Sequence, residues 1–258
     1  ADSAFINIDT SYGATLVERT SLTLTTISRT NPKAHWHFTN ITPTQQGAEF
    51  SIRGTGGILI ESQTSLHGGY NADNLLLAVA LAHESGVDPI ELAAVIPQLT
   101  GAPGRLDAVV LGQPFKAFVD YAHSPDAVTN VLSAAREFTT GKIIAVLGCG
   151  GDRDATKRPL MGAALSKGCD IAIFTSDNPR SESPAAILRE MVSSLDVKAP
   201  SAIIEDRAAA ISHAVSVAEA GDTVLVLGKG HEQGQDIAGV VTDFDDRIVL
   251  ATAIEARG

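Results

Sequence analysis

The sequence has few of the features that mark several protein classes. It contains two cysteines in 258 residues, Cys149 and Cys169, and they form no CxxC pair. This excludes a disulfide framework, and two buried free thiols in a reducing cytosol are the simpler interpretation. No segment reaches the roughly 20 apolar residues of a membrane span, and no charged-then-apolar signal peptide begins the chain. We therefore expect a cytoplasmic protein with no membrane partner.

Basic residues are also scarce. The chain has 19 lysines and arginines against 30 aspartates and glutamates, which gives a net charge of −11. Because contacts with phosphates need clustered cations, this balance argues against a nucleic-acid partner, although it is compatible with a local basic pocket for one small anion. The hydrophobic content of 44% and the charged content of 19% are typical of a globular protein with a sizeable core.

The usual phosphate-binding motifs are missing. The pattern GxxxxGK[ST] occurs nowhere, because "GDRDATKR" lacks the glycine before Lys157. The segments "GCGGDRD" and "GKGHEQG" both lack the third glycine of GxGxxG. The histidines show no zinc-ligand spacing, and no Ser/His/Asp or Cys/His arrangement stands out. Motifs of this kind therefore argue for neither ATP hydrolysis nor dinucleotide binding.

From residue 114 onward, short apolar runs alternate with helical patterns, which is typical of βαβ units and a mostly parallel sheet. The turn at 112–114 predicts a hairpin and hence one antiparallel edge. The predicted strands are residues 115–122, 142–148, 169–176, 201–205 and 222–228, and the predicted helices are 125–138, 157–167, 184–195 and 207–219.

The first hundred residues are less regular. Four segments alternate in the manner of strands, and two helical segments follow at 71–86 and 88–101. Asn71 or Asp73 is expected near the start of the first helix and Gly86 just past its end, while Asp88 and Pro89 begin the second. The predicted strands are residues 20–30, 35–44, 47–54 and 56–62. The predicted fold class is α/β, with domains at 1–106 and 107–258.

Charged or glycine-rich loops follow four of the predicted parallel strands, where α/β sheets bind ligands. Each loop alone has a structural explanation, such as a helix cap or a surface ion pair, but four on one rim favour a site. Arg153 and Arg180 can bind carboxylates through two-point contacts, and Asp177 and Glu232 can accept hydrogen bonds from an ammonium. Such a rim suits an amino acid or a diamino diacid.

The four loops also carry a resemblance. The segments "VDYAHSPDAVTNVL", "GCGGDRDATKRPLMG", "TSDNPRSESP" and "VLGKGHEQGQ" closely resemble the C-terminal domain of the Mur ligases over residues 101–258. The nearest members add meso-diaminopimelate as the third residue of the peptidoglycan stem peptide. More loosely, "INIDTSYG" and "GGYNADNLLLAVALA" resemble the end of the family's central ATPase domain.

The resemblance implies an amino-acid site built from the loops after three strands. The arginine of the DNPR motif selects diaminopimelate over lysine in the family, because it pairs with the distal carboxylate that lysine lacks. Pro179, whose φ is fixed, holds its neighbours on the loop. The residues implied to bind meso-diaminopimelate are Arg153, Asp177, Asn178, Pro179, Arg180, Gly228 and Glu232.

The resemblance likewise implies ATP-binding residues, which are Asn74, Arg105, Asp120 and His123. Tyr70 replaces the family's usual phenylalanine at the start of the first helix, and Thr10 stands where a second aspartate is more common. We therefore assign Asp9 no role, and no catalytic residue is assigned.

The activity implied by the resemblance is an ATP-dependent amide ligation in the cytoplasm. With ATP and Mg²⁺, the D-glutamate γ-carboxylate of UDP-MurNAc-dipeptide becomes an acyl phosphate, which the diaminopimelate amine attacks. The family's UDP-binding domain, phosphate loop and magnesium ligands would all precede residue 1. We therefore expect a C-terminal part of such an enzyme, inactive alone and partnered by the missing domains.

Two alternatives stay open. Folylpoly-γ-glutamate synthetases share the architecture, although the DNPR motif argues against them. The second is a non-catalytic amino-acid-binding module, which binds a ligand without joining it to anything. The missing phosphate loop favours this module, whereas the interrupted central domain favours a truncated enzyme.

Overall fold

The computed structural model describes residues 3–44 and 46–257. Residues 1–101 and 102–258 form two separate units, and each unit has a sheet and a core of its own. None of the helices in the described ranges is long and apolar enough to cross a membrane.

The second unit is built on a six-stranded sheet with the strand order β10-β9-β8-β11-β7-β6. All pairs are parallel except β6 with β7, so the predicted mixed sheet with one antiparallel edge is confirmed. Every residue of β8 is buried, as expected for a central parallel strand covered on both faces. The strands are β6 (Asp107–Ala108), β7 (Lys116–Asp120), β8 (Ile143–Cys149), β9 (Ile171–Ser176), β10 (Ala202–Ile203) and β11 (Thr223–Leu227).

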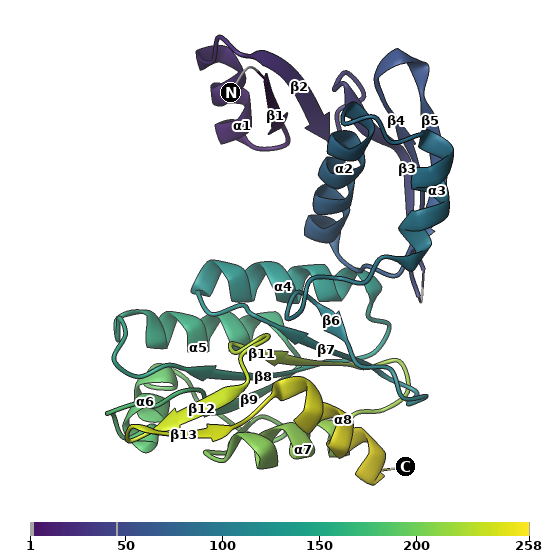
Figure 1. The fold of residues 1–258 in the computed structure, drawn as a ribbon. Coiled ribbons are helices and arrows are strands. Elements are labelled where there is room, and N and C mark those ends of the chain that lie inside the picture. Colours follow the sequence, from purple (N-terminus) through teal and green to yellow (C-terminus); the bar gives the residue numbers. More distant parts are fainter. Residues whose placement is uncertain (1–2, 45, 258) are drawn as a thin grey trace. The chain divides into compact units, whose positions relative to one another are not determined.

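Helices cover both faces of this sheet. Figure 1 shows α4 and α5 on one face and α7 and α8 on the other. Alternate strand residues such as Val146 and Val226 pack against Ile211 and Leu250 of the α7–α8 layer. The predicted helices are confirmed, although α6 ends four residues earlier than 195. The helices are α4 (Pro125–Phe138), α5 (Lys157–Gly168), α6 (Pro184–Met191), α7 (Arg207–Val217) and α8 (Asp246–Arg257).

The chain after β11 holds elements that the sequence did not predict. A two-stranded antiparallel ribbon of β12 (Gly234–Ile237) and β13 (Val240–Asp243) precedes α8. Four-residue strands with an exposed β13 give no clear alternation of apolar and polar residues. The ribbon is joined to the loop after β9, because Arg180 donates its backbone N–H to the Asp236 carbonyl at 2.9 Å.

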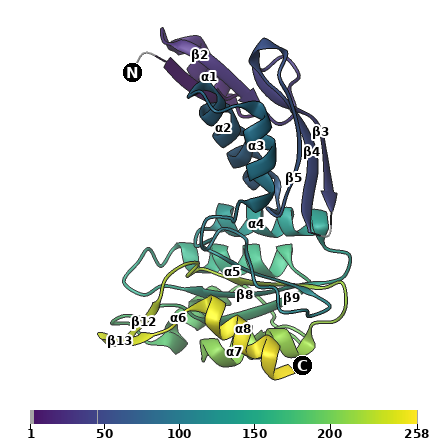
Figure 2. The same ribbon diagram turned by 45° about the vertical axis from the view of Figure 1, so that its right-hand side comes forward.

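The first unit has a five-stranded sheet in sequence order, parallel from β1 to β3 and antiparallel from β3 to β5. Figure 2 shows α2 and α3 packed on the same face of this sheet. Trp36, Ile52 and Leu76 are at the centre of its core. The elements are β1 (Ser3–Asn7), α1 (Ser11–Arg19), β2 (Thr23–Ser28), β3 (Trp36–Thr44), β4 (Gly47–Arg53), β5 (Leu59–Thr64), α2 (Gly69–Glu84) and α3 (Pro89–Val95), with 3₁₀ turns at Thr55–Gly57 and Ile96–Gln98.

The ends of α2 and α3 can be compared with the predicted capping residues. Asp88 caps α3 by accepting the Ile90 N–H at 2.8 Å, as predicted. Gly86, with φ of 102°, lies just past the end of α2, also as predicted. Helix α2 begins at Gly69 after a glycine N-cap, so Asn71 lies in its first turn, near the start as predicted. Helix α1 was not predicted.

A buried ion pair ties α7 and α8 to the carboxyl ends of two strands. Arg207 begins α7 and Asp246 begins α8, and both side chains are fully buried. The guanidinium donates to both carboxylate oxygens, at 2.8 and 2.7 Å. It also donates to the carbonyls of Ser176 and Leu227, the last residues of β9 and β11. The pair therefore fixes the points at which two rim loops leave the sheet.

Replacing Arg207 should destabilise the protein strongly. The variant Arg207→Met leaves the Asp246 carboxylate buried without its partner, a change that typically costs about 3–5 kcal/mol. Urea denaturation measures the loss. The exposed Arg189→Met is the matched control, with an expected change within about 0.5 kcal/mol. A loss for Arg207→Met no larger than the control's would contradict this role of the pair.

Candidate functional site

A cavity of about 410 Å³ lies at the carboxyl ends of β7, β8, β9 and β11. All four loops that the sequence placed on the rim contribute to it, so the structure brings these segments together. Its lining residues are Tyr121, His123, Gly148, Cys149, Gly150, Arg153, Asp154, Lys157, Arg158, Met161, Asp177, Asn178, Arg180, Gly228 and Glu232. Six of the seven predicted amino-acid-binding residues are among them, and Pro179 is not.

Backbone contacts of the loop after β9 hold the Arg180 side chain at the cavity. Arg180 has a φ of 52°, a left-handed conformation unusual for a residue with a side chain. Its backbone bonds on both sides to the β12–β13 ribbon, at Asp236 and Ala238, and its guanidinium donates to the Gly151 carbonyl at 2.7 Å. The ribbon thus stabilises a backbone shape that aims Arg180 at the neighbouring loop.

The loops after β8 and β9 are in backbone-to-backbone contact. A Cβ added to Gly151 would lie 1.9 Å from the Pro179 carbonyl oxygen, and the Gly151 N–H donates to the Asn178 carbonyl at 2.9 Å. Pro179 therefore supports the site through its backbone, packed behind Gly151. Arg153, on the same loop, is exposed at the cavity and has no hydrogen bond or ion pair with any residue in the described ranges.

Arg158 is a charged residue at the site that the sequence reasoning missed. Its side chain is 3% exposed, and it donates to Glu182 at 2.7 and 2.8 Å and to Glu190 at 2.8 Å. Glu182 also accepts the Asp152 N–H at 2.6 Å. The bonds from Arg158 lower the pKa of Glu182 from 4.5 to about 2. These contacts join the start of α5 to the loops on either side of the cavity.

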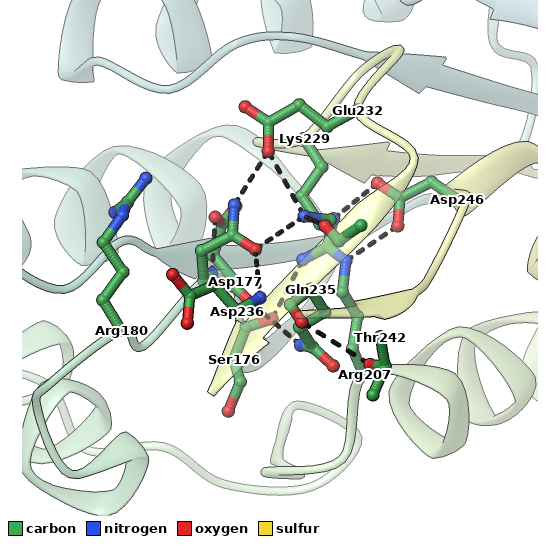
Figure 3. Close-up of polar contacts among 12 residues, drawn as sticks. Ser176, Asp177, Arg180, Arg207, Lys229, Glu232, Gln235, Asp236, Thr242 and Asp246 are labelled. Atoms are coloured by element: carbon green, nitrogen blue, oxygen red, sulfur yellow. Dashed lines mark hydrogen bonds and ion pairs between the residues drawn. The ribbon is translucent and has the colours of Figure 1, made fainter. Parts of the chain in front are cut away.

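The loop after β11 buries a lysine. Lys229 lies between Gly228 and Gly230, whose φ values of 112° and 54° are in the glycine-favoured region. Its ammonium donates to the Asn178 side-chain oxygen at 3.0 Å and lies 3.3 Å from Glu232. Figure 3 shows this group beside the Arg207–Asp246 pair. In the sequence, Lys229 is marked only by its place between two glycines, and the family resemblance assigns roles to Gly228 and Glu232 of the same segment.

Asp177, the first residue after β9, places another carboxyl at the cavity. Burial raises the pKa of Asp177, while the nearby charges of Arg207 and Lys229 oppose that shift. One Asp177 oxygen accepts the Asn178 N–H at 2.7 Å, and the other lies where a Cβ on Gly228 would approach to 2.8 Å. Asp177 is therefore a partly buried carboxyl, held by its own loop, that lines the cavity.

Of the residues predicted to bind ATP, His123 lines the cavity. Asp120 is buried and accepts the backbone N–H groups of Leu106 and Ala122, so its carboxylate holds the turn that carries Arg105. The Arg105 guanidinium lies 5.8 Å from the centre of the Tyr121 ring. The sequence did not single out Tyr121. The centre of its ring lies 4.5 Å from that of His123 and 5.4 Å from that of His231.

Asn74, the remaining predicted ATP-binding residue, belongs to the other unit. It is exposed on α2, five residues after the helix begins at Gly69. Its neighbour Asn71 is buried and donates to the His67 carbonyl at 2.9 Å, which fixes the start of the helix. The structure therefore describes Asn74 in the first unit and the other three residues in the second.

Neither thiol nor metal chemistry stands out at the cavity. Cys149 is a free, buried thiol whose sulfur lies 3.5 Å from that of Met161, and burial raises its pKa to about 12. Cys169 is free and partly buried, and burial raises its pKa to about 12 as well. Within residues 3–44 and 46–257, no group of three or more His, Cys, Asp or Glu side chains could hold a metal ion.

Two protein-family models match the chain in sequence. The Mur ligase middle domain matches residues 1–82, and the Mur ligase glutamate ligase domain matches residues 104–230. The chain belongs to the Mur ligase family. The resemblance carried by the four loop motifs is thereby confirmed, and the second match covers three of the four rim loops and the fourth as far as Gly230.

Curated Mur ligases are similar along almost the whole chain. A UDP-N-acetylmuramoyl-L-alanyl-D-glutamate–2,6-diaminopimelate ligase of Streptomyces coelicolor is 47% identical over 256 residues, covering 97% of this chain and 51% of the relative. The protein of the same name from Bacillus cereus is 45% identical over 218 residues, covering 84% of this chain and 44% of the relative. The chain thus spans about half the length of the curated relatives it matches.

Solved structures agree on the fold. A UDP-N-acetylmuramoyl-L-alanyl-D-glutamate–2,6-diaminopimelate ligase superposes with a TM-score of 0.72 at 35% identity, covering 99% of this chain and 53% of that one. A Mycobacterium tuberculosis folylpolyglutamate synthase, solved with ADP and AMPPCP, gives 0.65 at 21% identity, covering 88% and 52%. The second likeness concerns the fold alone, and both agree with the predicted α/β class.

Acid should weaken the contact between Arg158 and Glu182. Because the pKa of Glu182 is lower in the folded than in the unfolded chain, its stabilising contribution is complete above about pH 5 and is lost as the pH falls to about 2. The variant Glu182→Gln lacks this contribution. The gap in unfolding free energy between the native chain and Glu182→Gln should therefore be largest near neutrality and close toward pH 2.

Denaturation of both chains in urea at several pH values measures this gap. Glu137→Gln, an exposed change on α4, is the control, and its gap should not vary with pH. A gap for Glu182→Gln that stays constant from pH 7 to pH 2 would contradict the argument.

Proposed function

We propose that the chain forms the amino-acid-binding part of an ATP-dependent ligase, which joins meso-diaminopimelate to UDP-N-acetylmuramoyl-L-alanyl-D-glutamate. The observation that carries the proposal is one cavity lined by the guanidiniums of Arg153 and Arg180 and by the carboxylate of Glu232. The curated relatives named for this reaction, with up to 47% identity, support the choice of substrate.

The charges of the cavity match the ends of the proposed ligand. Arg153, which lacks an internal partner among the described residues, is available to bind a carboxylate. Arg180 uses one nitrogen on Gly151, which leaves its other donors for a second carboxylate. Glu232, with a side chain 35% exposed, can accept hydrogen bonds from an ammonium. Diaminopimelate has carboxylates at both ends, whereas lysine has one, so lysine would leave a guanidinium unpaired.

In this proposal the chain's residues orient the ligand for attack. A bound ligand is held by charge-assisted bonds from its two carboxylates and one ammonium, so its second amine keeps a fixed direction. ATP would phosphorylate the γ-carboxylate of the precursor and leave as ADP. The amine, in its unprotonated form, would then attack the acyl phosphate and displace inorganic phosphate to form the amide. Glu232 and Arg180 then contribute orientation and selectivity.

The same unit offers a surface for a nucleotide. Tyr121, His123 and His231 form a ring cluster with the Arg105 guanidinium beside it, and such groups stack on a base or bind phosphate oxygens. We infer that ATP binds at this cluster, while a role of Asn74, in the first unit, stays a prediction from the family resemblance. The described residues include no set of side chains that fits Mg²⁺. The need for ATP and the two free thiols favour a cytoplasmic location.

Calorimetric titration of the chain with meso-diaminopimelate and with L-lysine tests the proposal, together with ligation by the full-length protein. We expect diaminopimelate to bind and be ligated, with lysine weaker by up to about 10⁴-fold. Equal use of lysine, or ligation of glutamate to folate in place of either, would contradict it. Binding of diaminopimelate without ligation by the full-length protein would favour a non-catalytic binding module.

The variant Arg180→Met should weaken diaminopimelate binding by about 10- to 100-fold, because it removes a charge-assisted contact. Lysine binding should change much less, so the variant should discriminate poorly between the two ligands. Arg189→Met, exposed on α6, is the control and should bind like the native chain. Titration of the native chain and both variants with each ligand gives the ratio of the two dissociation constants. An unchanged ratio in Arg180→Met would show that Arg180 does not bind the distal carboxylate.

A further inference from the structure

Lys229 is the most completely enclosed cation at the cavity rim. Its side chain is 0% exposed, and its ammonium has three acceptors. These are the Gly234 carbonyl at 2.6 Å, the Asn178 Oδ1 at 3.0 Å and the Glu232 Oε2 at 3.3 Å. An ammonium has three protons, so the buried charge is fully satisfied by groups from three segments.

These contacts determine which way the Asn178 amide points. Lys229 Nζ can only donate, and the Asp236 backbone N–H, 3.1 Å away, can only donate as well. Both require the oxygen of the amide on their side. The amide nitrogen must therefore face the opposite way, where it donates to Glu232 Oε2 at 2.8 Å.

The orientation of Glu232 follows from that of Asn178. Its Oε2 accepts from both Asn178 and Lys229. Within the described ranges no residue bonds to its Oε1, and the side chain lines the cavity. Lys229 also partly neutralises the Glu232 charge, which lowers the cost of holding the carboxylate in place before a ligand arrives.

We propose that Lys229 is a positioning residue for the amino-acid substrate, which orients Asn178 and Glu232 so that Glu232 Oε1 is presented to the substrate ammonium. The inference rests on the proposed function and deepens it, because it assigns a role to a residue that touches no substrate. The structural reason for a lysine here is its reach, since one ammonium joins the ribbon at Gly234 to both side chains.

The glycines beside Lys229 support the same role. A Cβ on Gly230 would lie 2.7 Å from that of Tyr121, and a Cβ on Gly228 would lie 2.8 Å from the Asp177 carboxylate. With both positions closed to side chains, the loop packs tightly and turns Lys229 inward. The lysine is thus held by the fold on every side before any ligand binds.

The variant Lys229→Met in the full-length protein tests the proposal, because methionine fills similar space without the charge. We expect KM for meso-diaminopimelate to rise by about 100-fold, as lost charged contacts predict, with KM for ATP changed less than about threefold. The control is Lys167→Met, exposed in the last turn of α5, with both KM values unchanged. Equal rises in both KM values, or no rise, would overturn the proposal.

A double-mutant cycle separates positioning from a general loss of structure. If Lys229 acts through Glu232, adding Lys229→Met to Glu232→Gln should raise KM for diaminopimelate little further. If KM for diaminopimelate in the double variant rises by the product of the two single rises, the two residues act independently and the proposal is overturned. A native protein that does not use diaminopimelate at all would instead refute the proposed function, so the two failures are distinguishable.

NMR of the native chain keeps the proposal testable if Lys229→Met does not fold. The Lys229 ammonium should give a slowly exchanging ¹H–¹⁵N signal that shifts when meso-diaminopimelate is added. The Lys167 ammonium, which is exposed, should give no such signal. A Lys229 ammonium that exchanges rapidly, or whose signal is unaffected by saturating diaminopimelate, would overturn the proposal.

Discussion

The site depends first on the buried pair of Arg207 and Asp246. A buried ion pair contributes little net stability compared with an apolar pair, so its value lies in what it fixes. Here the guanidinium also binds the last carbonyls of β9 and β11, the two strands whose loops carry Asn178 and Glu232. An apolar pair could fill the same space, but it could not hold those carbonyls. The position of both loops is therefore set by two residues that do not line the cavity.

Above this pair, close backbone contacts replace side-chain packing. Gly151 lies against Pro179, and Gly104 lies against the Gly230–His231 backbone, at distances that exclude a Cβ. The loops therefore support one another at fixed spacing, and the few charged side chains that remain project from a rigid base. Lys229 and Arg158 are each buried with carboxylate partners and link neighbouring loops. Preorganisation of this kind reduces the conformational entropy that a small polar ligand must overcome when it binds.

Sequence patterns predicted the sheet of the second unit because its strands are continuous apolar runs and its helices begin at clear caps, such as Ser124 with Pro125. They did not predict α1, the β12–β13 ribbon or α8, which are short or only partly buried, so that tertiary contacts hold them. The rim residues could be predicted from their place after strands. Lys229, Arg158 and the Arg207–Asp246 pair could not, because the contacts that give them a role, with Asn178, Glu182 and each other, span 24 to 51 residues of sequence.

A crystal structure of the chain with meso-diaminopimelate is the most direct measurement of the central claim, that this cavity is a preorganised site for a diamino diacid. The account predicts a carboxylate of the ligand paired with Arg180 and an ammonium within hydrogen-bond distance of Glu232 Oε1. It also predicts Asn178 and Lys229 in the positions they occupy without ligand. A ligand bound with its carboxylates away from both Arg153 and Arg180, or a Lys229 side chain that turns outward on binding, would contradict the account.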